Sequence, residues 1–155
     1  MTPFRFDRVG NGVLLLKIRP AIPSDDLLAI WREVYRADYF ALLPAGVELL
    51  FEPRGEAWVA EADGAAAGFA YVDGEWLDEL WVRKPFQGRG VGTALVRHAE
   101  ILMRAAGVAR ARLSVLQANA RAIALYRRLG WTEGQAFQDR RSGVWNFEMG
   151  KELLG

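Results

Sequence analysis

The spacing of apolar residues predicts a strand and then a helix near the N-terminus. Residues 13–18 form an apolar run typical of a strand. Ser24 next suits a helix N-cap, and Asp25 and Asp26 follow in the first helical turn, where acidic groups are favourable. Beyond them, apolar residues recur every three or four positions and define one helix face. That face comprises Leu27, Ile30, Trp31, Val34 and Tyr35.

From residue 38 onward the pattern changes from helix to strand. Residues 38–52 show no sustained period, and a Pro-Ala-Gly sequence within them argues against a long helix, so we expect a short second helix and a loop. Three apolar runs follow at residues 57–62, 65–72 and 75–82. The Asp-Gly pairs between these runs are strong signals for hairpin turns. The sequence therefore predicts an antiparallel meander.

A long amphipathic helix is predicted at residues 90–106. Its apolar face is formed by Val91, Leu95, Leu102 and Ala106. Its charged residues are placed off that face; they are Arg97, Glu100 and Arg104. Gly107 suits the C-terminal stop, because glycine readily adopts the left-handed conformation found there.

The C-terminal part of the chain continues with strands around one more helix. Residues 110–116 predict a buried strand, and residues 119–129 a helix that is capped by its first residue and closed by Gly130. A final pair of strands is predicted at residues 131–138 and 144–149. This order of elements predicts a mixed sheet with helices on both faces.

Length and composition limit the function classes. The 155 residues fit a single domain over residues 1–155, and a net charge of +1 gives no reason to expect nucleic acid or a membrane as partner. The chain has no cysteine and one histidine, His98, so we expect no metal and no histidine-based triad. His98 is interpreted as a structural residue. No apolar run is long enough to span a membrane, and residues 1–7 lack a signal-peptide pattern, which predicts a cytoplasmic protein.

The clearest chemical signal is a glycine-rich segment between the third run of the meander and the long helix. It reads Gln87, Gly88, Arg89, Gly90, Val91, Gly92, Thr93. Alternate glycines leave room for backbone N–H groups to surround a ligand oxyanion where the chain turns into a helix. Arg89 and Thr93 can add side-chain donors. The spacing is neither that of a dinucleotide fingerprint nor that of a Walker A loop, so we expect a different phosphate-bearing cofactor.

This segment resembles the pyrophosphate loop of the GNAT superfamily of acetyl-CoA-dependent N-acetyltransferases, with Gln87, Gly90 and Gly92 at the motif positions. A second element similar to that family runs from Asn119 to Trp131 and ends in Leu-Gly-Trp. The resemblance implies acetyl-CoA (coenzyme A) as co-substrate. It also implies the GNAT fold, an α/β (α+β) domain with a single mixed, mostly antiparallel twisted sheet of about seven strands and helices on both faces.

The resemblance assigns roles to several residues. The exposed backbone of Leu80, Trp81 and Val82 is expected to bind the pantetheine arm as an added strand would, while the Trp81 side chain packs in the core. Asn119 is expected to contact the pantetheine region. Tyr126, two helical turns further on, is expected near the thioester sulfur as the general acid for the leaving thiolate. The alternative for Tyr126 is a purely packing role on its helix.

The general base is less clearly indicated. Glu79 is the candidate, since family members place a carboxylate on the strand before the glycine loop, and Asp78 is expected to face the opposite side of that strand. A water relay or solvated carboxylates remain alternatives. Some family members carry a glutamate five residues before the asparagine, where this chain has Ser114; that departs from the subgroup that acetylates ribosomal-protein N-termini.

The resemblance implies direct transfer of an acetyl group to a primary amine through a tetrahedral intermediate. A small-molecule amine is slightly favoured over a peptide or protein amine. Tyr35 and Tyr39 are the candidate substrate-binding residues, because the first helices form the acceptor wall in this family. Pairing through the C-terminal strands would give a homodimer. The alternative from another class is an acyl-CoA-binding sensor or scaffold module without efficient transfer.

Overall fold

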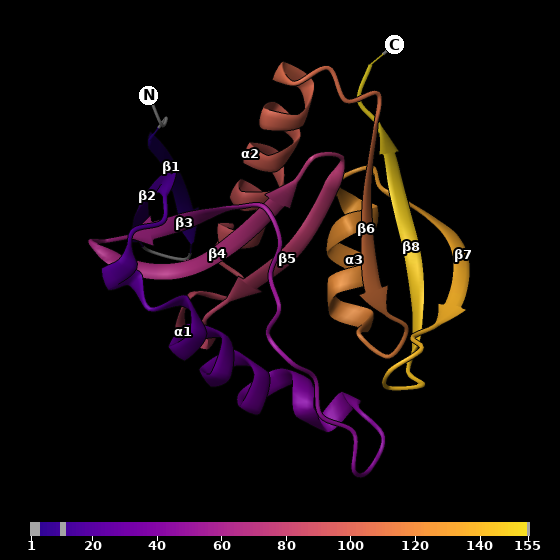
Figure 1. Cartoon of the computed structure of the whole chain (residues 1–155). Helices are drawn as coiled ribbons and strands as arrows, with labels where there is room; N and C mark the ends of the chain where they lie inside the picture. The colour runs from indigo at the N-terminus through magenta and orange to yellow at the C-terminus, as the bar shows by residue number, and fades with distance from the viewer. Residues whose placement is uncertain (1–3, 10–11, 155) are drawn as a thin grey trace.

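One eight-stranded sheet organises the computed structural model, which describes residues 4–9 and 12–154 (Figure 1). The strand order is β1-β2-β3-β4-β5-β6-β8-β7, and all neighbours are antiparallel except β5 and β6. The strands are β1 (Phe4–Val9), β2 (Gly12–Pro20), β3 (Glu56–Ala62), β4 (Ala65–Asp73), β5 (Trp76–Val82), β6 (Arg110–Leu116), β7 (Thr132–Gln138) and β8 (Trp145–Glu152). The expected mixed, mostly antiparallel sheet is confirmed.

Helices cover both faces of the sheet. They are α1 (Leu27–Val34), α2 (Val91–Ala105) and α3 (Ala120–Arg128). Adjacent strand residues such as Val59 and Ala60 belong to different buried clusters, which places the clusters on opposite faces. One cluster includes α1, and the other includes α2 and α3. Within the described ranges, no helix is both long and apolar enough to cross a membrane.

The sheet divides between β5 and β6. These two parallel strands share a single paired position, Trp76 with Arg112, and then diverge (Figure 1). The backbone of β5 beyond that pair therefore has no ladder partner in β6, as the family resemblance implies. This divergence positions the candidate site.

The meander β3–β4–β5 is confirmed close to its predicted bounds. The first turn uses left-handed backbone at Asp63 (φ 50°) and Gly64 (φ 82°), as a tight hairpin requires. The sequence pattern missed β1, whose residues mix aromatic and charged types without an apolar run, so the sheet has eight strands rather than about seven.

The N-terminal helix begins later than predicted. Asp26, not Ser24, is the N-cap of α1, and its carboxylate accepts a hydrogen bond from the Ala29 N–H (3.3 Å). Asp25 is instead bound by Arg19 (2.8 Å), and the turn η1 (Pro23–Asp25) forms before the helix. Of the predicted apolar face, Leu27 is half-buried and the other residues are buried: Ile30, Trp31, Val34 and Tyr35.

No separate second helix forms between residues 38 and 52. Instead α1 continues directly into a π-helical turn, η2 (Tyr35–Tyr39), and a 3₁₀ turn, η3 (Phe40–Leu42). An irregular segment then leads to β3. The expected loop is thus present, but the expected helix is an extension of the first.

The helix α2 differs from its predicted pattern at two positions. Glu100 is fully buried, and Ala106 is exposed beyond the helix end. The Glu100 carboxylate accepts hydrogen bonds from Lys151 Nζ (2.7 Å) and Trp131 Nε1 (3.3 Å), which satisfy a buried carboxylate that the sequence pattern placed off the apolar face. The predicted caps at Asn119 and Gly130 are confirmed for α3.

Candidate active site

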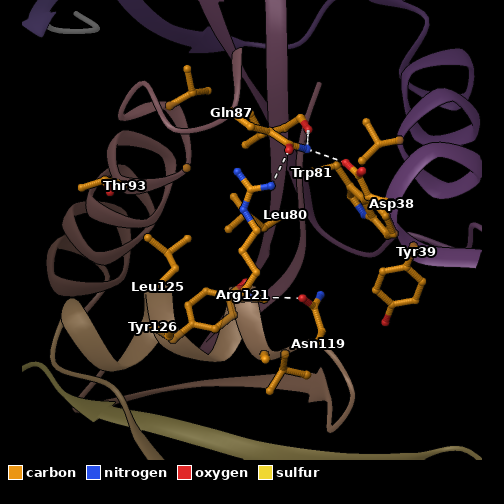
Figure 2. Close-up of a pocket in the computed structure, with 18 of the residues that line it drawn as sticks. Asp38, Tyr39, Leu80, Trp81, Gln87, Thr93, Asn119, Arg121, Leu125 and Tyr126 are labelled. Atoms are coloured by element: carbon orange, nitrogen blue, oxygen red, sulfur yellow. Dashed lines mark hydrogen bonds between the residues drawn. The ribbon is translucent and has the colours of Figure 1, made fainter. Parts of the chain in front are cut away.

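A cleft of about 860 Å³ opens where β5 and β6 diverge; we refer to it as the central cleft (Figure 2). Its walls come from the end of β5, the glycine loop with the start of α2, the helix α3, and the turns η2 and η3. Segments far apart in the sequence thus meet at one site. The volume lies in the range of ordinary ligand sites.

Most of the predicted site residues line this cleft. They are Tyr39, Glu79, Leu80, Trp81, Val82, Gln87, Gly88, Gly90, Val91, Gly92, Thr93, Asn119 and Tyr126. Two predicted residues, Arg89 and Tyr35, are not part of the lining. Asp38 and Arg121 are among the lining residues that were not predicted as part of the site.

The glycine loop forms an open cradle at the start of α2. A short turn, η4 (Lys84–Phe86), precedes it, and Gly88 (φ 71°) and Gly90 (φ 85°) have left-handed backbone. No side chain caps α2, so the N–H groups of its first turn remain available to a ligand anion. At Gly92 a Cβ would lie 3.3 Å from Leu125 Cδ2, so glycine also lets α2 approach α3. These features fit a phosphate-bearing cofactor.

Arg89 is not among the residues that line the central cleft. Its guanidinium carbon lies 5.9 Å from the centre of the ring of Phe86, which does line the cleft, in a cation–π contact. A role of the Arg89 side chain in binding the cofactor stays a prediction.

Gln87 connects three elements across the central cleft (Figure 2). Its Nε2 donates to Asp38 Oδ2 (2.6 Å) and to the Val82 carbonyl (3.0 Å), and its Oε1 accepts from Arg121 Nη1 (2.6 Å). Lys84 lies 3.6 Å from the same Asp38 carboxylate. The Gln87 side chain is therefore held on the η2 side of the cleft and presents its oxygen to α3.

The helix α3 supplies Asn119 and Tyr126 to the cleft. Asn119 Oδ1 accepts from the Ala122 N–H (3.2 Å), which caps the helix. The Tyr126 side chain is buried, and this burial raises the pKa of its hydroxyl above the usual value, with smaller contributions from Tyr39 and Glu79. The Tyr126 phenol is therefore protonated at neutral pH and able to donate a proton.

Glu79 lines the cleft directly after a bulge in β5. Leu77 pairs with Val72 and Glu79 with Tyr71, so Asp78 is the extra residue between them. Asp78 is thus a bulged residue rather than the simple opposite-facing one expected from alternation, and its carboxylate accepts from the Arg54 N–H (2.7 Å).

The environment of Glu79 prepares it to exchange protons near neutral pH. Burial raises the pKa of its carboxyl group to about 7; a hydrogen bond from Trp81 Nε1 (2.5 Å) opposes this rise, and the nearby Asp78 adds to it. A carboxyl group with this pKa is ionised in a large fraction of molecules at pH 7. It can therefore accept a proton from a substrate.

The two predicted acceptor tyrosines have different positions. Tyr39 lines the cleft and its ring packs 5.2 Å from that of Trp81. Tyr35 lies behind this wall, because its ring stacks on Trp31 (4.8 Å) and its hydroxyl accepts from the Leu49 N–H (3.1 Å). The structure therefore corrects the expectation for Tyr35, which supports the wall instead of facing a substrate.

A smaller hollow of about 380 Å³ adjoins the central cleft. The two cavities share Leu42 and Ala118. The remaining lining of this side hollow consists of Pro44, Leu116, Gln117, Val144 and Trp145. Trp145 is 50% exposed, so the hollow offers an apolar wall open to solvent. Sequence reasoning did not identify it, because its residues come from three separate segments.

A family model confirms what the fold and the glycine loop indicate. Residues 22–131 match the acetyltransferase (GNAT) family, and the chain belongs to this family. It is accordingly an N-acetyltransferase, a class of enzymes that takes the acetyl group from acetyl-CoA.

Two curated relatives come from Salmonella typhimurium. The peptidyl-lysine N-acetyltransferase YjaB is 30% identical over 70% of this chain and 76% of its own length. The [ribosomal protein bS18]-alanine N-acetyltransferase is 34% identical over 72% of this chain and 78% of its own length. A solved structure of yncA from the same organism with acetyl-CoA has a TM-score of 0.66 at 18% identity, covering 90% of this chain and 95% of its own, and supports the fold.

Proposed function

We propose that the protein transfers an acetyl group from acetyl-CoA directly to a primary amine through a tetrahedral intermediate. The observation that carries this proposal is the pairing of two groups in one cleft: Glu79, with a pKa of about 7, and the protonated Tyr126. One is suited to accept a proton and the other to donate one. The reaction requires both.

The cleft offers matching groups for the co-substrate. The free N–H groups at the start of α2 are suited to the pyrophosphate. The backbone of Leu80, Trp81 and Val82 pairs with β4 but has no ladder partner on the side toward β6, and this side is suited to the amides of the pantetheine arm. Asn119, the N-cap of α3, lines the same cleft. This order along the cleft directs the thioester toward Glu79 and Tyr126.

In the proposed mechanism Glu79 removes a proton from the acceptor ammonium group. The neutral amine then attacks the thioester carbonyl, and backbone donors near Val82 stabilise the developing oxyanion. When the C–S bond breaks, Tyr126 donates its proton to the thiolate. The nitrogen of the adduct gives up its surplus proton, which restores the Tyr126 phenol through water, and Glu79 returns its proton to solvent. Holding the amine next to the thioester supplies much of the rate enhancement, because orientation alone can lower the activation barrier by about 7 kcal/mol or more.

We favour a small-molecule amine as the acceptor. Ser114 lines the central cleft at the position where the subgroup that acetylates ribosomal proteins carries a glutamate. The side hollow, which shares Leu42 with the central cleft, is small and lined mainly by apolar residues. The two curated relatives are named for protein amines, so both acceptor classes belong in the test.

We further propose that two copies pair through β7, an edge strand of the sheet with the exposed Phe137 on it and the exposed Trp145 on its neighbour β8. Light scattering after gel filtration measures the mass directly, and a monomer at 100 μM would contradict this. A cytoplasmic location remains a prediction of the sequence.

The first experiment is a calorimetric titration with acetyl-CoA, using ATP and NAD as control ligands. We expect saturable one-site binding of acetyl-CoA alone. Release of free coenzyme A is then measured with a panel of small amines and peptides. No binding of acetyl-CoA would contradict the proposed site, and binding without coenzyme A release for any amine would favour the sensor module instead.

A further inference from the structure

Arg121 spans the central cleft from the first turn of α3 to the glycine loop (Figure 2). Its guanidinium donates to the Gln87 side-chain oxygen over 2.6 Å, and Gln87 is the first residue of that loop. The contact joins residues that lie 34 positions apart in the chain. It therefore crosses the space between two walls of the same cleft.

The charge of Arg121 is not balanced by its partner. Among the described residues, Arg121 contacts the neutral Gln87 amide and no carboxylate. Two arginines outside the cleft lining are instead paired with carboxylates: Arg83 binds Glu33 (2.8 Å), and Arg127 binds Glu133. A guanidinium bound only to an amide keeps most of its capacity to attract an anion.

The position of Gln87 is fixed independently of Arg121. Its nitrogen is already used by Asp38 and by the Val82 carbonyl, so only its oxygen faces α3. That oxygen holds the guanidinium beside the glycine loop and the free N–H groups of α2. The cation and the backbone donors thus converge on one region of the cleft.

We propose that Arg121 is a binding residue for the pyrophosphate of coenzyme A, and that its guanidinium exchanges the Gln87 oxygen for phosphate oxygens when the ligand binds. This inference rests on the proposed use of acetyl-CoA. A phosphate accepts stronger, charge-assisted hydrogen bonds than an amide and matches the planar guanidinium with two oxygens. The pyrophosphate is the relevant group because the Arg121 guanidinium lies at the glycine loop, where the pyrophosphate is expected to bind.

The experiment is calorimetric titration of the whole protein with coenzyme A and with dephospho-coenzyme A, which lacks the 3′-phosphate but keeps the pyrophosphate. The variants are Arg121→Gln, Arg121→Lys and a control, Arg32→Gln, which removes one positive charge from an exposed position on α1 outside the cleft lining. We expect Arg121→Gln to weaken binding of both ligands roughly tenfold or more. Arg121→Lys is expected to lose less, and Arg32→Gln to bind as the wild type does.

Three outcomes would overturn the inference. Unchanged affinity of Arg121→Gln and Arg121→Lys for both ligands removes Arg121 from the binding site. A loss confined to coenzyme A, with dephospho-coenzyme A unaffected, assigns Arg121 to the 3′-phosphate instead. Failure of the wild-type protein to bind either ligand contradicts the proposed function itself, which separates that failure from the failure of this assignment. Arg121→Lys keeps the test decisive if Arg121→Gln does not fold.

Discussion

At the scale of single residues, burial sets the protonation states of Glu79 and Tyr126, the two groups proposed as base and acid. It raises the pKa of Glu79 to about 7 and raises the pKa of Tyr126 above its usual value. The same physical cause serves opposite purposes, because loss of water disfavours the charged form of both groups. A carboxyl group at a pH near its pKa is a usable base. A phenol at a pH far below its pKa stays protonated, which is the form that a general acid needs, while the raised pKa makes it a weaker acid.

Replacing Tyr126 with phenylalanine tests the acid role. We expect Tyr126→Phe to lower turnover by roughly 10²-fold, the lower end of the usual effect of a positioned acid. Affinity for acetyl-CoA should stay within about twofold, because the buried ring is kept. Steady-state kinetics and calorimetry measure the two quantities, with Tyr71→Phe outside the cleft lining as the matched control. Wild-type turnover would leave Tyr126 with a packing role only.

The activity of the wild type is expected to rise with pH through about 7, as Glu79 loses its proton. The hydrogen bond from Trp81 Nε1 stabilises the Glu79 carboxylate and so lowers its pKa. Trp81→Phe removes this bond, and the rising limb of the kcat/KM profile should move to higher pH. A profile that keeps its midpoint in Trp81→Phe would argue against Glu79 as the base.

Glu79 also links stability to pH, independently of catalysis. Its carboxyl pKa is about 7 in the folded chain against 4.5 when unfolded, so between these values the folded state binds more protons and stability falls as pH rises. Glu79→Gln removes this loss. We expect the unfolding free energy of Glu79→Gln minus that of the wild type, both measured in urea, to increase by about 3 kcal/mol between pH 4 and pH 8. A constant difference would mean that the Glu79 pKa is not raised.

The residues found from sequence and those missed differ in how far their partners lie along the chain. Gln87, Gly90 and Asn119 belong to local motifs with a fixed spacing, and the structure brings them to one cleft. Asp38 and Arg121 are recognised as site residues only from their contacts with Gln87, which lies 49 and 34 residues away from them in the chain. A single aspartate or arginine on a helical turn carries no local signal for such a contact.

At the scale of elements, the helix α3 carries three of the side chains to which we assign a role in the central cleft. Its N-cap is Asn119, its first turn carries Arg121, and Tyr126 follows on the face that lines the cleft. Because one cap fixes the start of the helix, it also fixes how these side chains enter the cleft. A change at the start of α3 is therefore expected to affect both the stability of the protein and the binding of its ligand.

Two substitutions at Asn119 separate these effects. Asn119→Ala removes the cap, and we expect it to lower the free energy of unfolding by about 1 kcal/mol. We also expect it to weaken the binding of acetyl-CoA. Asn119→Asp keeps the capping oxygen but loses the amide donor, so we expect near-wild-type stability with weaker acetyl-CoA binding. Urea unfolding and calorimetry measure both. If Asn119→Asp binds acetyl-CoA as the wild type does, the amide does not contact the pantetheine arm.

The elements that sequence reasoning located well are those with local signals. The Asp-Gly turns fix the meander, since left-handed backbone at Asp63 and Gly64 needs those residue types. The start of α1 was misplaced because Arg19, from β2, binds Asp25. The bulge at Asp78 could not be predicted either, because it depends on the register of β5 with β4.

At the scale of the whole molecule, the sheet consists of two parts joined at one end. The strands β1 to β5 form one part, the strands β6 to β8 form the other, and Trp76 with Arg112 is their single paired position. Buried contacts of α2 and α3 hold the parts together on one face. The central cleft lies at the opening between them, so a ligand in the cleft contacts both.

Acetyl-CoA should therefore stabilise the molecule by linking its two parts. At 100 times its dissociation constant it adds about 2.7 kcal/mol, which for a chain of this length raises the melting temperature by roughly 5–10 °C. We expect hydrogen exchange to slow mainly at the end of β5 and the start of α3, and to change little in the β3–β4 turn, which lies outside the cleft lining. Any bound ligand raises the melting temperature. Only a ligand that lies between β5 and β6 is expected to slow hydrogen exchange on both sides of the cleft. Protection confined to the glycine loop would mean that the pantetheine arm does not enter between β5 and β6.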